Sequence, residues 1–334
     1  MKFFLTGGSG FLGRNLIRYA LHKDDKLSIT VLSRSEKSDE IILKAAGNEK
    51  HRIQILRGNI EDEQVLIKGV SDVEVVIHLA AKVQPWGMFF DFEIINIGGT
   101  RKLVTAIEQS ANKPRLVYVS SFTALVSNHH DKDNIPNWAP YSKSKALSED
   151  IVFNSSLSDK VLIRLGWLWG KDDDVLLPKL ISLSKNPLWK ICPRTYPVST
   201  QHVTNACEAV YLVANIPSLP SQLYEFKDPD GDIDIEDFLE LYVKAASQPS
   251  NNVPRPFENF RAPKWLVWGL ITFVECIPFL NYGKKWVMEG MTREPLMLLF
   301  NDFRLDDAKA RKEVGYVGNV RRTEGFDEVA EIRR

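Results

Sequence analysis

A tyrosine and a lysine in this sequence have the types and the spacing needed for proton transfer. Tyr141 and Lys145 lie four residues apart in the segment YSKSK, which is predicted to begin a helix, so both lie on one helix face. A lysine ammonium about 4 Å from a phenol, at an effective dielectric constant of about 20, favours the phenolate by about 4 kcal/mol and lowers its pKa by about three units. We therefore expect Tyr141 to exchange a proton near neutral pH.

Ser121 is the expected third member of this catalytic group. It follows Ser120 at the end of a predicted strand, where the carboxyl edge of a parallel sheet faces a ligand crevice. A hydroxyl there can hold a carbonyl oxygen while the phenol of Tyr141 delivers or removes the proton. The three residues together predict acid–base catalysis at a carbonyl group.

A glycine-rich turn near the N-terminus predicts dinucleotide binding. Residues 6–13, TGGSGFLG, follow the first predicted strand, open the first predicted helix, and match G-x-G-x-x-G as well as G-x-x-G-x-x-G. Glycines let backbone N–H groups approach a pyrophosphate at the positive end of a helix. The alternative, a turn that only reverses the chain, is disfavoured by the strand-turn-helix context. The expected contacts are Gly7, Gly10, Phe11, Leu12 and Gly13.

The choice of cofactor depends on Ser33 and Arg34, which follow the second predicted strand. NAD-selective proteins place a carboxylate on the ribose 2′-hydroxyl at this position, and this sequence has none. Arg34 can pair with a 2′-phosphate while Ser33 donates a hydrogen bond. We therefore predict NADP(H), with NAD(H) as the alternative cofactor and a solvated arginine as the alternative interpretation of Arg34.

Short apolar segments alternate with amphipathic segments over the first half of the chain. The predicted strands are Phe3–Thr6, Ser28–Ser33, Ile53–Arg57, Val73–Leu79, Leu116–Ser120 and Val161–Arg164. The predicted helices are Phe11–Leu21, Glu63–Lys68, Gly99–Ser110 and Tyr141–Phe153. Continuous apolar strands between helices indicate parallel strands covered on both faces. The predicted fold class is α/β, a doubly wound parallel sheet of the Rossmann type.

The second half is less regular and rich in tryptophan. Gln222–Phe226 and Ile235–Ala246 predict a strand and a helix that return to the sheet. We expect a dinucleotide-binding domain over residues 1–165, with returning segments at about 200–246. We expect a smaller, interleaved substrate-binding domain over residues 166–199 and 247–334.

Composition excludes several classes of protein. The 334 residues are 44% hydrophobic and 26% charged, which is typical of a globular protein. The net charge of +0 provides no field that would gather nucleic acid, so no nucleic-acid partner is expected. Cys192, Cys207 and Cys276 lack metal-ligand spacing, and His129-His130 lacks a third ligand, so no metal site is expected. Unpaired thiols predict a reducing, cytoplasmic location.

The apolar segment from Trp265 to Leu280 is interrupted by Glu275 and Pro278 and is shorter than the roughly 20 residues that span a bilayer. We interpret it first as a core helix, then as a cover over an apolar substrate, and third as a segment lying on a membrane surface. The third interpretation is the source of the expected peripheral membrane contact.

The glycine turn, Ser121, Tyr141 and Lys145 occur in the order found in the extended short-chain dehydrogenase/reductases, which the chain resembles over nearly its whole length. Ala80-Ala81-Lys82 with Trp86-Gly87, and the tail from Pro263 to Arg304, resemble the 3β-hydroxysteroid dehydrogenase branch. The resemblance implies cofactor contacts at Asn59, Ile60, Ala80, Ala81, Tyr141, Lys145 and Leu165. It also implies substrate contacts at Lys82, Trp86, Trp167 and Trp268.

Three positions depart from that family's pattern. Asn59 replaces an aspartate that usually meets the adenine amino group, although an asparagine carbonyl can accept the same hydrogen bond. Leu165 replaces a proline, and Lys171-Asp172-Asp173 replaces a Pro-Gly pair. The last two changes concern the loops around nicotinamide and substrate, and leave the catalytic trio intact.

The resemblance implies an NADP(H)-dependent oxidoreductase that interconverts a secondary alcohol and a ketone on a hydrophobic substrate, sterol-like or a long-chain 3-oxo compound. Its partners are expected to be that small molecule and a second copy of the chain. One alternative is a nucleotide-sugar epimerase or dehydratase, which shares the trio. Another is a scaffold that binds NADP(H) without turnover.

Overall fold

The computed structural model describes residues 1–83, 87–129, 135–174, 176–184, 196–220, 222–247, 263–280 and 292–331. Its centre is a seven-stranded sheet in the order β10-β6-β5-β4-β1-β2-β3, and every neighbouring pair is parallel. The strands are β1 (Lys2–Thr6), β2 (Ser28–Ser33), β3 (Ile53–Arg57), β4 (Val75–His78), β5 (Arg115–Ser121), β6 (Lys160–Leu165) and β10 (Leu223–Phe226). The winding reverses between β1 and β4, so the predicted doubly wound α/β sheet is confirmed.

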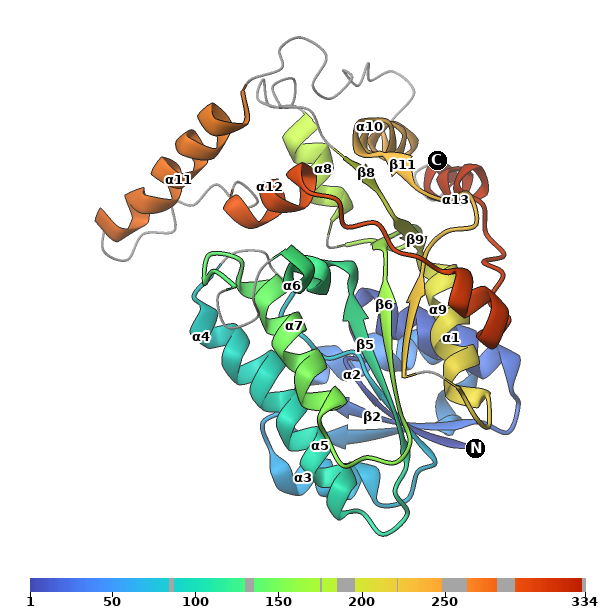
Figure 1. Cartoon of the computed structure of the whole chain (residues 1–334). Helices are drawn as coiled ribbons and strands as arrows, with labels where there is room; N and C mark the ends of the chain where they lie inside the picture. The colour runs from blue at the N-terminus through green and yellow to red at the C-terminus, as the bar shows by residue number, and fades with distance from the viewer. Residues whose placement is uncertain are drawn as a thin grey trace.

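Helices cover both faces of this sheet. Figure 1 shows α3 (Glu63–Val70), α5 (Gly99–Gln109) and α7 (Pro140–Phe153) on one face, and α1 (Phe11–Lys23) with α9 (Val203–Asn215) on the other. Residues of β1 point alternately to the two layers: Phe3 and Leu5 join the core on the α1 and α9 side, and Phe4 joins the other core. This double burial explains why consecutive residues in the middle of the strands are mostly apolar.

The sequence-based strands agree with the structure to within about two residues at each end, whereas two of the helices that pack against the sheet were not predicted from periodicity. These are α2 (Glu36–Ala46), whose segment EKSDEIILKAA is mainly polar, and α9 (Val203–Asn215). Short helical turns are η1 (Gly47–Arg52), η2 (Glu93–Gly98), η3 (Phe122–Leu125) and η6 (Ala310–Val314), with short helices α4 (Phe89–Phe92) and α6 (Val126–His129).

The second half of the chain forms a further apolar cluster around the fully buried Trp169. Its elements are β7 (Trp167–Trp169), β8 (Pro197–Val198), β9 (Thr200–His202), β11 (Ile233–Asp234), α8 (Leu177–Ser184), α10 (Ile235–Ala246) and α13 (Arg322–Glu331). The predicted return of a strand is confirmed, since β10 pairs with β6. The predicted return of the next helix is wrong, because α10 packs on α8, α13 and Trp169.

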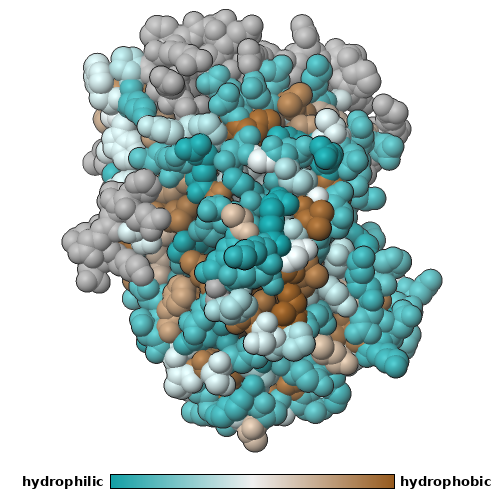
Figure 2. Space-filling view, turned by 45° about the vertical axis from the view of Figure 1, so that its right-hand side comes forward, coloured by the Kyte–Doolittle hydropathy of each residue, from teal (hydrophilic) through white to brown (hydrophobic). Residues whose placement is uncertain are grey.

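Helices α11 (Lys264–Leu280) and α12 (Arg293–Phe300) lie beyond the carboxyl edge of the sheet (Figure 1). The first interpretation of α11, a core helix, is wrong, since Trp265 is 75% and Phe273 66% exposed and only one side of the helix packs inward. No helix in the described ranges is long and apolar enough to cross a membrane. The face of the molecule in Figure 2 is mainly hydrophilic, with small hydrophobic areas between the polar side chains.

A buried ion pair attaches α7 to the sheet. The Arg164 guanidinium on β6 donates two hydrogen bonds to the Glu149 carboxylate on α7, at 2.9 and 2.7 Å, and a third to Glu225 on β10 at 3.1 Å. Glu149 is 3% exposed. Removing one partner of such a pair leaves the other charge buried without compensation.

We expect Arg164→Met to lower the free energy of unfolding by about 3–5 kcal/mol, because the Glu149 carboxylate remains buried without its cation. Chemical denaturation measures this loss. The matched control is Arg304→Met, which removes an arginine from the exposed pair with Asp302 and should cost at most about 1 kcal/mol. Equal losses in the two variants would contradict a stabilising role for the buried pair.

Candidate active site

Ser121 and Tyr141 meet at the carboxyl edge of the sheet, as predicted. Ser121 is the last residue of β5, and its hydroxyl accepts a hydrogen bond from the Thr123 amide at 3.3 Å. It lies close enough to the Tyr141 phenol, in the first turn of α7, to lower the pKa of that phenol. The neighbouring Ser120 is buried, and its hydroxyl has no partner among the described residues. The structure therefore distinguishes Ser121 from Ser120 as the serine beside the phenol.

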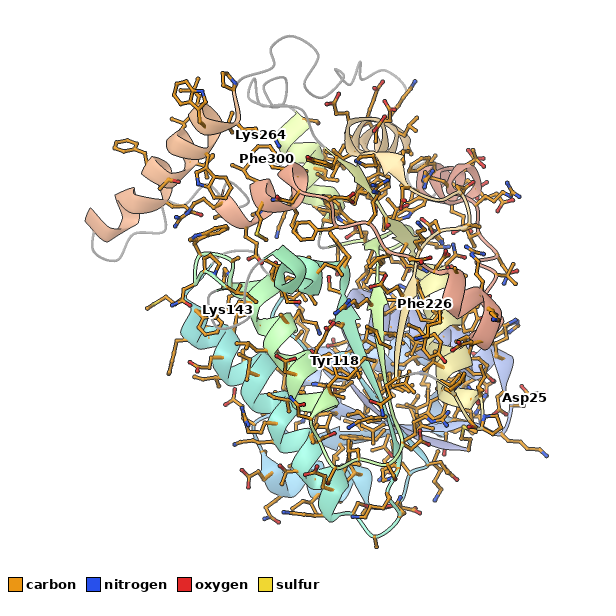
Figure 3. All side chains as sticks on the ribbon, viewed as in Figure 1. Asp25, Tyr118, Lys143, Phe226, Lys264 and Phe300 are labelled. Carbon is orange, nitrogen blue, oxygen red and sulfur yellow. The ribbon has the colours of Figure 1, made fainter. Side chains whose placement is uncertain are left out.

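Lys145 lies one turn further along α7 and is 4% exposed. Its ammonium donates to the Val119 carbonyl at 2.8 Å and lies over the Tyr118 ring, 4.4 Å from the centroid. Figure 3 shows Tyr118 between the strands and α7. Val119, whose carbonyl binds the ammonium, is two residues before Ser121 on β5. Burial lowers the pKa of Lys145 to about 7, partly opposed by the nearby Glu149 carboxylate.

The expectation that Lys145 lowers the pKa of Tyr141 is wrong for this structure. Burial raises the pKa of Tyr141 to about 12, the hydrogen bond with Ser121 lowers it, and the charge of Glu294 raises it further. The physical reason is that Lys145 points its ammonium at a backbone carbonyl and is itself buried, so it provides little charge to the phenol. A spacing of four places two residues on one face without fixing where their ends point.

Hydrogen bonds from Asn96 on η2 connect the loop after β4 to helix α7. Its amide oxygen accepts from the Lys82 amide at 2.7 Å, and its amide nitrogen donates to the Lys82 carbonyl and to the Ser144 hydroxyl. Ser144 in turn donates to the Tyr141 carbonyl at 2.7 Å, and Ser148 donates to the Asn96 carbonyl. The loop that carries Ala80 and Ala81 is therefore fixed relative to α7.

The glycine turn has the shape of a phosphate cradle. Gly7 has φ +78°, and a Cβ there would lie 2.7 Å from the Ala80 amide nitrogen, so the turn lies directly against the loop after β4. A Cβ at Gly13 would lie 2.2 Å from the Gly7 carbonyl oxygen. The first turn of α1 has no side-chain cap and no acidic residue, so its N–H groups, those of Phe11 and Leu12 among them, are available to an anion. These features fit a dinucleotide.

The predicted adenosine side of the site lies at the ends of β2 and β3. Ser33 is buried and donates to the Ser35 carbonyl at 3.3 Å, whereas Arg34 is exposed and has no ion pair within the described ranges. The side-chain oxygen Oδ1 of Asn59 accepts a hydrogen bond from the Ile60 amide at 2.8 Å, which leaves one lone pair of that oxygen for an adenine amino group. Ile60 is a core residue whose side chain packs on Gly99.

The two loop departures have structural explanations. Leu165 ends β6, is 1% exposed and pairs in register with Ser121. In the loop after β7, the Asp173 carboxylate accepts from the Leu176 and Leu177 amides, which caps α8, and from the Tyr242 hydroxyl. The neighbouring residues Asp172 and Asp174 contact Arg14 on α1. Charge pairing thus attaches this loop to the glycine-turn helix without the family's usual Pro-Gly pair.

Two of the four predicted substrate contacts line an aromatic wall. The Trp167 ring stacks on Phe122, beside Ser121, with centroids 6.3 Å apart. The Trp268 ring on α11 packs edge to face on Trp138, at 5.2 Å. Lys82 pairs with Asp91 at 2.7 Å and lies over Phe92, so its charge is already compensated. Trp86 lies outside the described residues.

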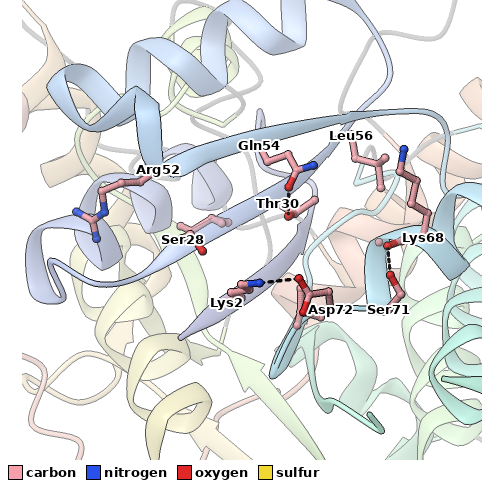
Figure 4. A pocket seen from close by; sticks show the side chains of 12 residues that line it. Lys2, Ser28, Thr30, Arg52, Gln54, Leu56, Lys68, Ser71 and Asp72 are labelled. Carbon is pink, nitrogen blue, oxygen red and sulfur yellow. Dashed lines mark hydrogen bonds and ion pairs between the residues drawn. The ribbon is translucent and has the colours of Figure 1, made fainter. Parts of the chain in front are cut away.

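Other candidate features carry no chemistry in this structure. A hollow of about 240 Å³ (Figure 4) is lined by the first residues of β1 and β2 and by the Lys2–Asp72 ion pair, at the edge of the sheet opposite the trio. Cys207 is buried, which raises its thiol pKa. No group of three potential metal ligands occurs within the described part of the chain.

Sequence reasoning missed one residue beside the trio, Glu294 on α12, whose carboxylate accepts from the backbone amides of Tyr141 and Ser142. No sequence signal could have indicated it, because the contact joins residues more than 150 positions apart. Glu294 also raises the pKa of the phenol, so it belongs to the surroundings of the site.

Comparison with known proteins identifies relatives over the whole chain. A ketoreductase from Stigmatella aurantiaca, named for 4-hydroxy-2-methyl-3-oxo-4-farnesyl-3,4-dihydroquinoline-1-oxide, is 28% identical and covers 98% of this chain and 95% of its own. The decarboxylating sterol-4-alpha-carboxylate 3-dehydrogenase of Dictyostelium discoideum is 26% identical, covering 98% and 99%. A dTDP-glucose 4,6-dehydratase structure from Streptomyces venezuelae matches with TM-score 0.69 at 17% identity, covering 99% and 96%, and so shares the fold.

A model of the 3-beta hydroxysteroid dehydrogenase/isomerase family matches residues 4–215, which contain the glycine turn and the trio. This span is more than half of the chain. The chain belongs to the 3-beta hydroxysteroid dehydrogenase/isomerase family and is a nicotinamide-dependent oxidoreductase of the short-chain dehydrogenase/reductase type.

Proposed function

We propose that this protein is an NADP(H)-dependent oxidoreductase that interconverts a secondary alcohol and a ketone on a hydrophobic small molecule, sterol-like or a long-chain 3-oxo compound. The observation that carries the proposal is the contact between Ser121 and Tyr141 at the end of β5, with Lys145 one turn away. A hydroxyl pair at this edge can hold one carbonyl oxygen, which is the arrangement that ketone reduction needs.

The proposed roles follow from the positions of the three side chains. Ser121 donates a hydrogen bond to the substrate oxygen and orients it. Tyr141 donates a proton to that oxygen in reduction and removes it in oxidation. Lys145 holds the nicotinamide ribose through its ammonium group. A bound nicotinamide ring supplies or accepts the hydride.

Aromatic side chains support a hydrophobic substrate. Trp167 lies on Phe122, the residue after Ser121, and Trp268 lies on Trp138, three residues before Tyr141. Both apolar surfaces therefore adjoin the proposed catalytic residues. The names of the two relatives refer to a farnesylated quinoline oxide and to a sterol carboxylate, which agrees with an apolar site. A nucleotide sugar would instead require cations for its diphosphate.

We propose that residues 166–199 and 247–334 form the substrate-binding part and that residues 1–165 bind the dinucleotide. This division agrees with the glycine turn in the first part and the aromatic wall formed partly by the second. The homodimer, the peripheral membrane contact and the cytoplasmic location stay predictions.

A panel of ketones tests the proposed function. Purified full-length protein with NADPH should reduce steroid or long-chain 3-oxo compounds, followed by the nicotinamide absorbance, and should leave sugar nucleotides unchanged. Tyr141→Phe keeps the ring but removes the proton donor, so kcat should fall about 100-fold or more while NADPH affinity changes little.

Tyr211→Phe is the control for this substitution. Tyr211 lies on α9 against Tyr19, away from the trio, so its hydroxyl should not affect turnover. Near-normal kcat in Tyr141→Phe would remove Tyr141 from the mechanism. Turnover of sugar nucleotides alone would favour the epimerase or dehydratase alternative, and NADPH binding without any turnover would favour the scaffold.

Cofactor choice is tested at Arg34. A hydrogen bond to a charged group contributes about 1.5–3 kcal/mol, so Arg34→Ala should raise KM for NADPH by roughly 10- to 150-fold and leave KM for NADH nearly unchanged. The control Arg101→Ala removes an exposed arginine from α5, away from β2, and should change neither value. A preference of the wild type for NADH, or equal losses with both cofactors, would refute the phosphate role of Arg34.

The apolar wall is tested at Trp268. Longer ketones should have lower KM in the wild type, and Trp268→Ala should reduce that preference without abolishing activity on a small ketone, because an apolar contact is lost while the trio remains. The control Trp265→Ala removes an indole that is 75% exposed on the same helix. Equal kcat/KM across chain lengths in the wild type would contradict an apolar pocket.

A further inference from the structure

The N-terminus of the catalytic helix is capped by a carboxylate from a distant element. Glu294 on α12 is fully buried, and its Oε1 accepts from the Ser142 amide at 2.6 Å and from the Ser142 hydroxyl at 2.5 Å. Its Oε2 accepts from the Tyr141 amide at 3.3 Å. One side chain therefore binds the backbone of the residue that carries the phenol.

The local sequence leaves a place for this contact. The first N–H groups of a helix have no partner inside the helix. In α7 the residue before the first turn is Ala139, which provides no side-chain cap, and Pro140 has no N–H to satisfy. The two following amides, of Tyr141 and Ser142, are the ones that Glu294 binds. A negative charge at this end of a helix also interacts favourably with the helix dipole.

Charged groups surround Glu294 on three elements. Arg293 beside it on α12 is paired with Glu275 of α11, through its backbone amide at 2.7 Å and its guanidinium. Lys145 lies on α7, on the far side of Tyr141 along the helix. Burial raises the pKa of Glu294 to about 7, opposed by the hydrogen bonds from Ser142 and Tyr141, and Glu275 raises it further. Above that pH the carboxylate is charged beside Tyr141.

We propose that Glu294 is a positioning residue that holds the start of α7 and so fixes the place and the electrostatic surroundings of Tyr141, a role that rests on the proposed catalytic function of that tyrosine. Glu294 lies outside residues 4–215, the span that the family model matches. The contact therefore belongs to this chain's C-terminal helices and connects them to the proton donor.

The same helices border the aromatic wall. Trp268 of α11 packs on Trp138, and Arg293 of α12 lies over the Trp138 ring, with its guanidinium carbon 5.2 Å from the ring centroid. Figure 3 shows Lys264 and Phe300 lying near one another where α11 and α12 meet, and the Lys264 ammonium donates to the Phe300 carbonyl at 3.2 Å. A substrate that binds against α11 and α12 and fixes their position would therefore fix the position of Glu294 as well.

Amide hydrogen exchange in the full-length protein tests the contact independently of activity. In Glu294→Ala the amides of Tyr141 and Ser142 lose a charged acceptor, so they should exchange about tenfold faster or more. Glu294→Gln keeps one carbonyl acceptor and should show a smaller increase. The control Glu331→Gln removes the same charge from an exposed position on α13 and should leave both amides unchanged. Unchanged exchange in Glu294→Ala would overturn the proposal.

The pH profile separates positioning of Tyr141 from general stabilisation. The probe is the steroid or long-chain secondary alcohol that the wild type oxidises fastest with NADP⁺. Oxidation needs the phenolate, and a nearby carboxylate disfavours it, so Glu294→Gln should move the rise of kcat to lower pH by on the order of one unit. Glu331→Gln should keep the wild-type midpoint. If a folded Glu294→Gln protein keeps the wild-type pH midpoint of kcat, the proposed effect of the Glu294 charge on Tyr141 is refuted.

The two readouts also separate this inference from the proposed function. If the wild type oxidises no alcohol and reduces no ketone, the proposed function fails. Exchange at Tyr141 and Ser142 then still decides whether Glu294 holds the helix. Rapid exchange in Glu294→Ala together with a normal pH profile in Glu294→Gln would assign a purely structural cap and refute the catalytic positioning.

Discussion

Helix α7 is buried through polar side chains, and the geometry of the candidate site depends on the contacts that satisfy them. Ser142, Ser144, Lys145, Ser148 and Glu149 are all buried. A buried polar group is costly unless it is hydrogen-bonded. Each of these side chains has a specific partner: a carboxylate on α12, an asparagine on η2, a carbonyl of β5, or an arginine on β6. An apolar helix could slide or rotate on the sheet at little cost, whereas α7 satisfies all of these groups in one position.

The partners of α7 lie at one edge of the sheet because of the strand order. With β4, β5 and β6 adjacent and parallel, the residues that follow each strand come together, so Ala80, Ser121 and Leu165 are near neighbours although they are far apart in sequence. The glycine turn after β1 joins them because β1 pairs with β4, and Gly7 lies against the Ala80 amide. The sheet thus brings the glycine turn and the loop after β4 to the same edge at which α7 places Tyr141 beside Ser121.

The features that were predictable from sequence depend on short-range patterns. The strands, the glycine turn and the identity of Ser121, Tyr141 and Lys145 follow from local periodicity and from motif order. The prediction that Lys145 lowers the pKa of Tyr141 is wrong, because the Lys145 ammonium points to the Val119 carbonyl of strand β5, a contact that the local sequence does not reveal. The packing partners of α10 and the contact of Glu294 with α7 could not be predicted from the sequence for the same reason. Both contacts depend on packing between segments that are far apart in the chain, and the local sequence of one segment does not indicate its partner.

The division between predictable and unpredictable parts corresponds to a difference in physical constraint. Residues 4–215 contain six of the seven strands of the central sheet, which is covered on both faces, and glycines whose Cβ atoms would clash with backbone, so few sequences satisfy these constraints. Helices α11 and α12 contact the rest through a few side chains, Trp268 and Glu294 among them, and leave much of α11 exposed. Such helices can change most of their surface while keeping the sheet and α7 intact. Because these helices adjoin both the aromatic wall and the start of α7, a substitution in them that alters the aromatic wall can also alter the position of Tyr141.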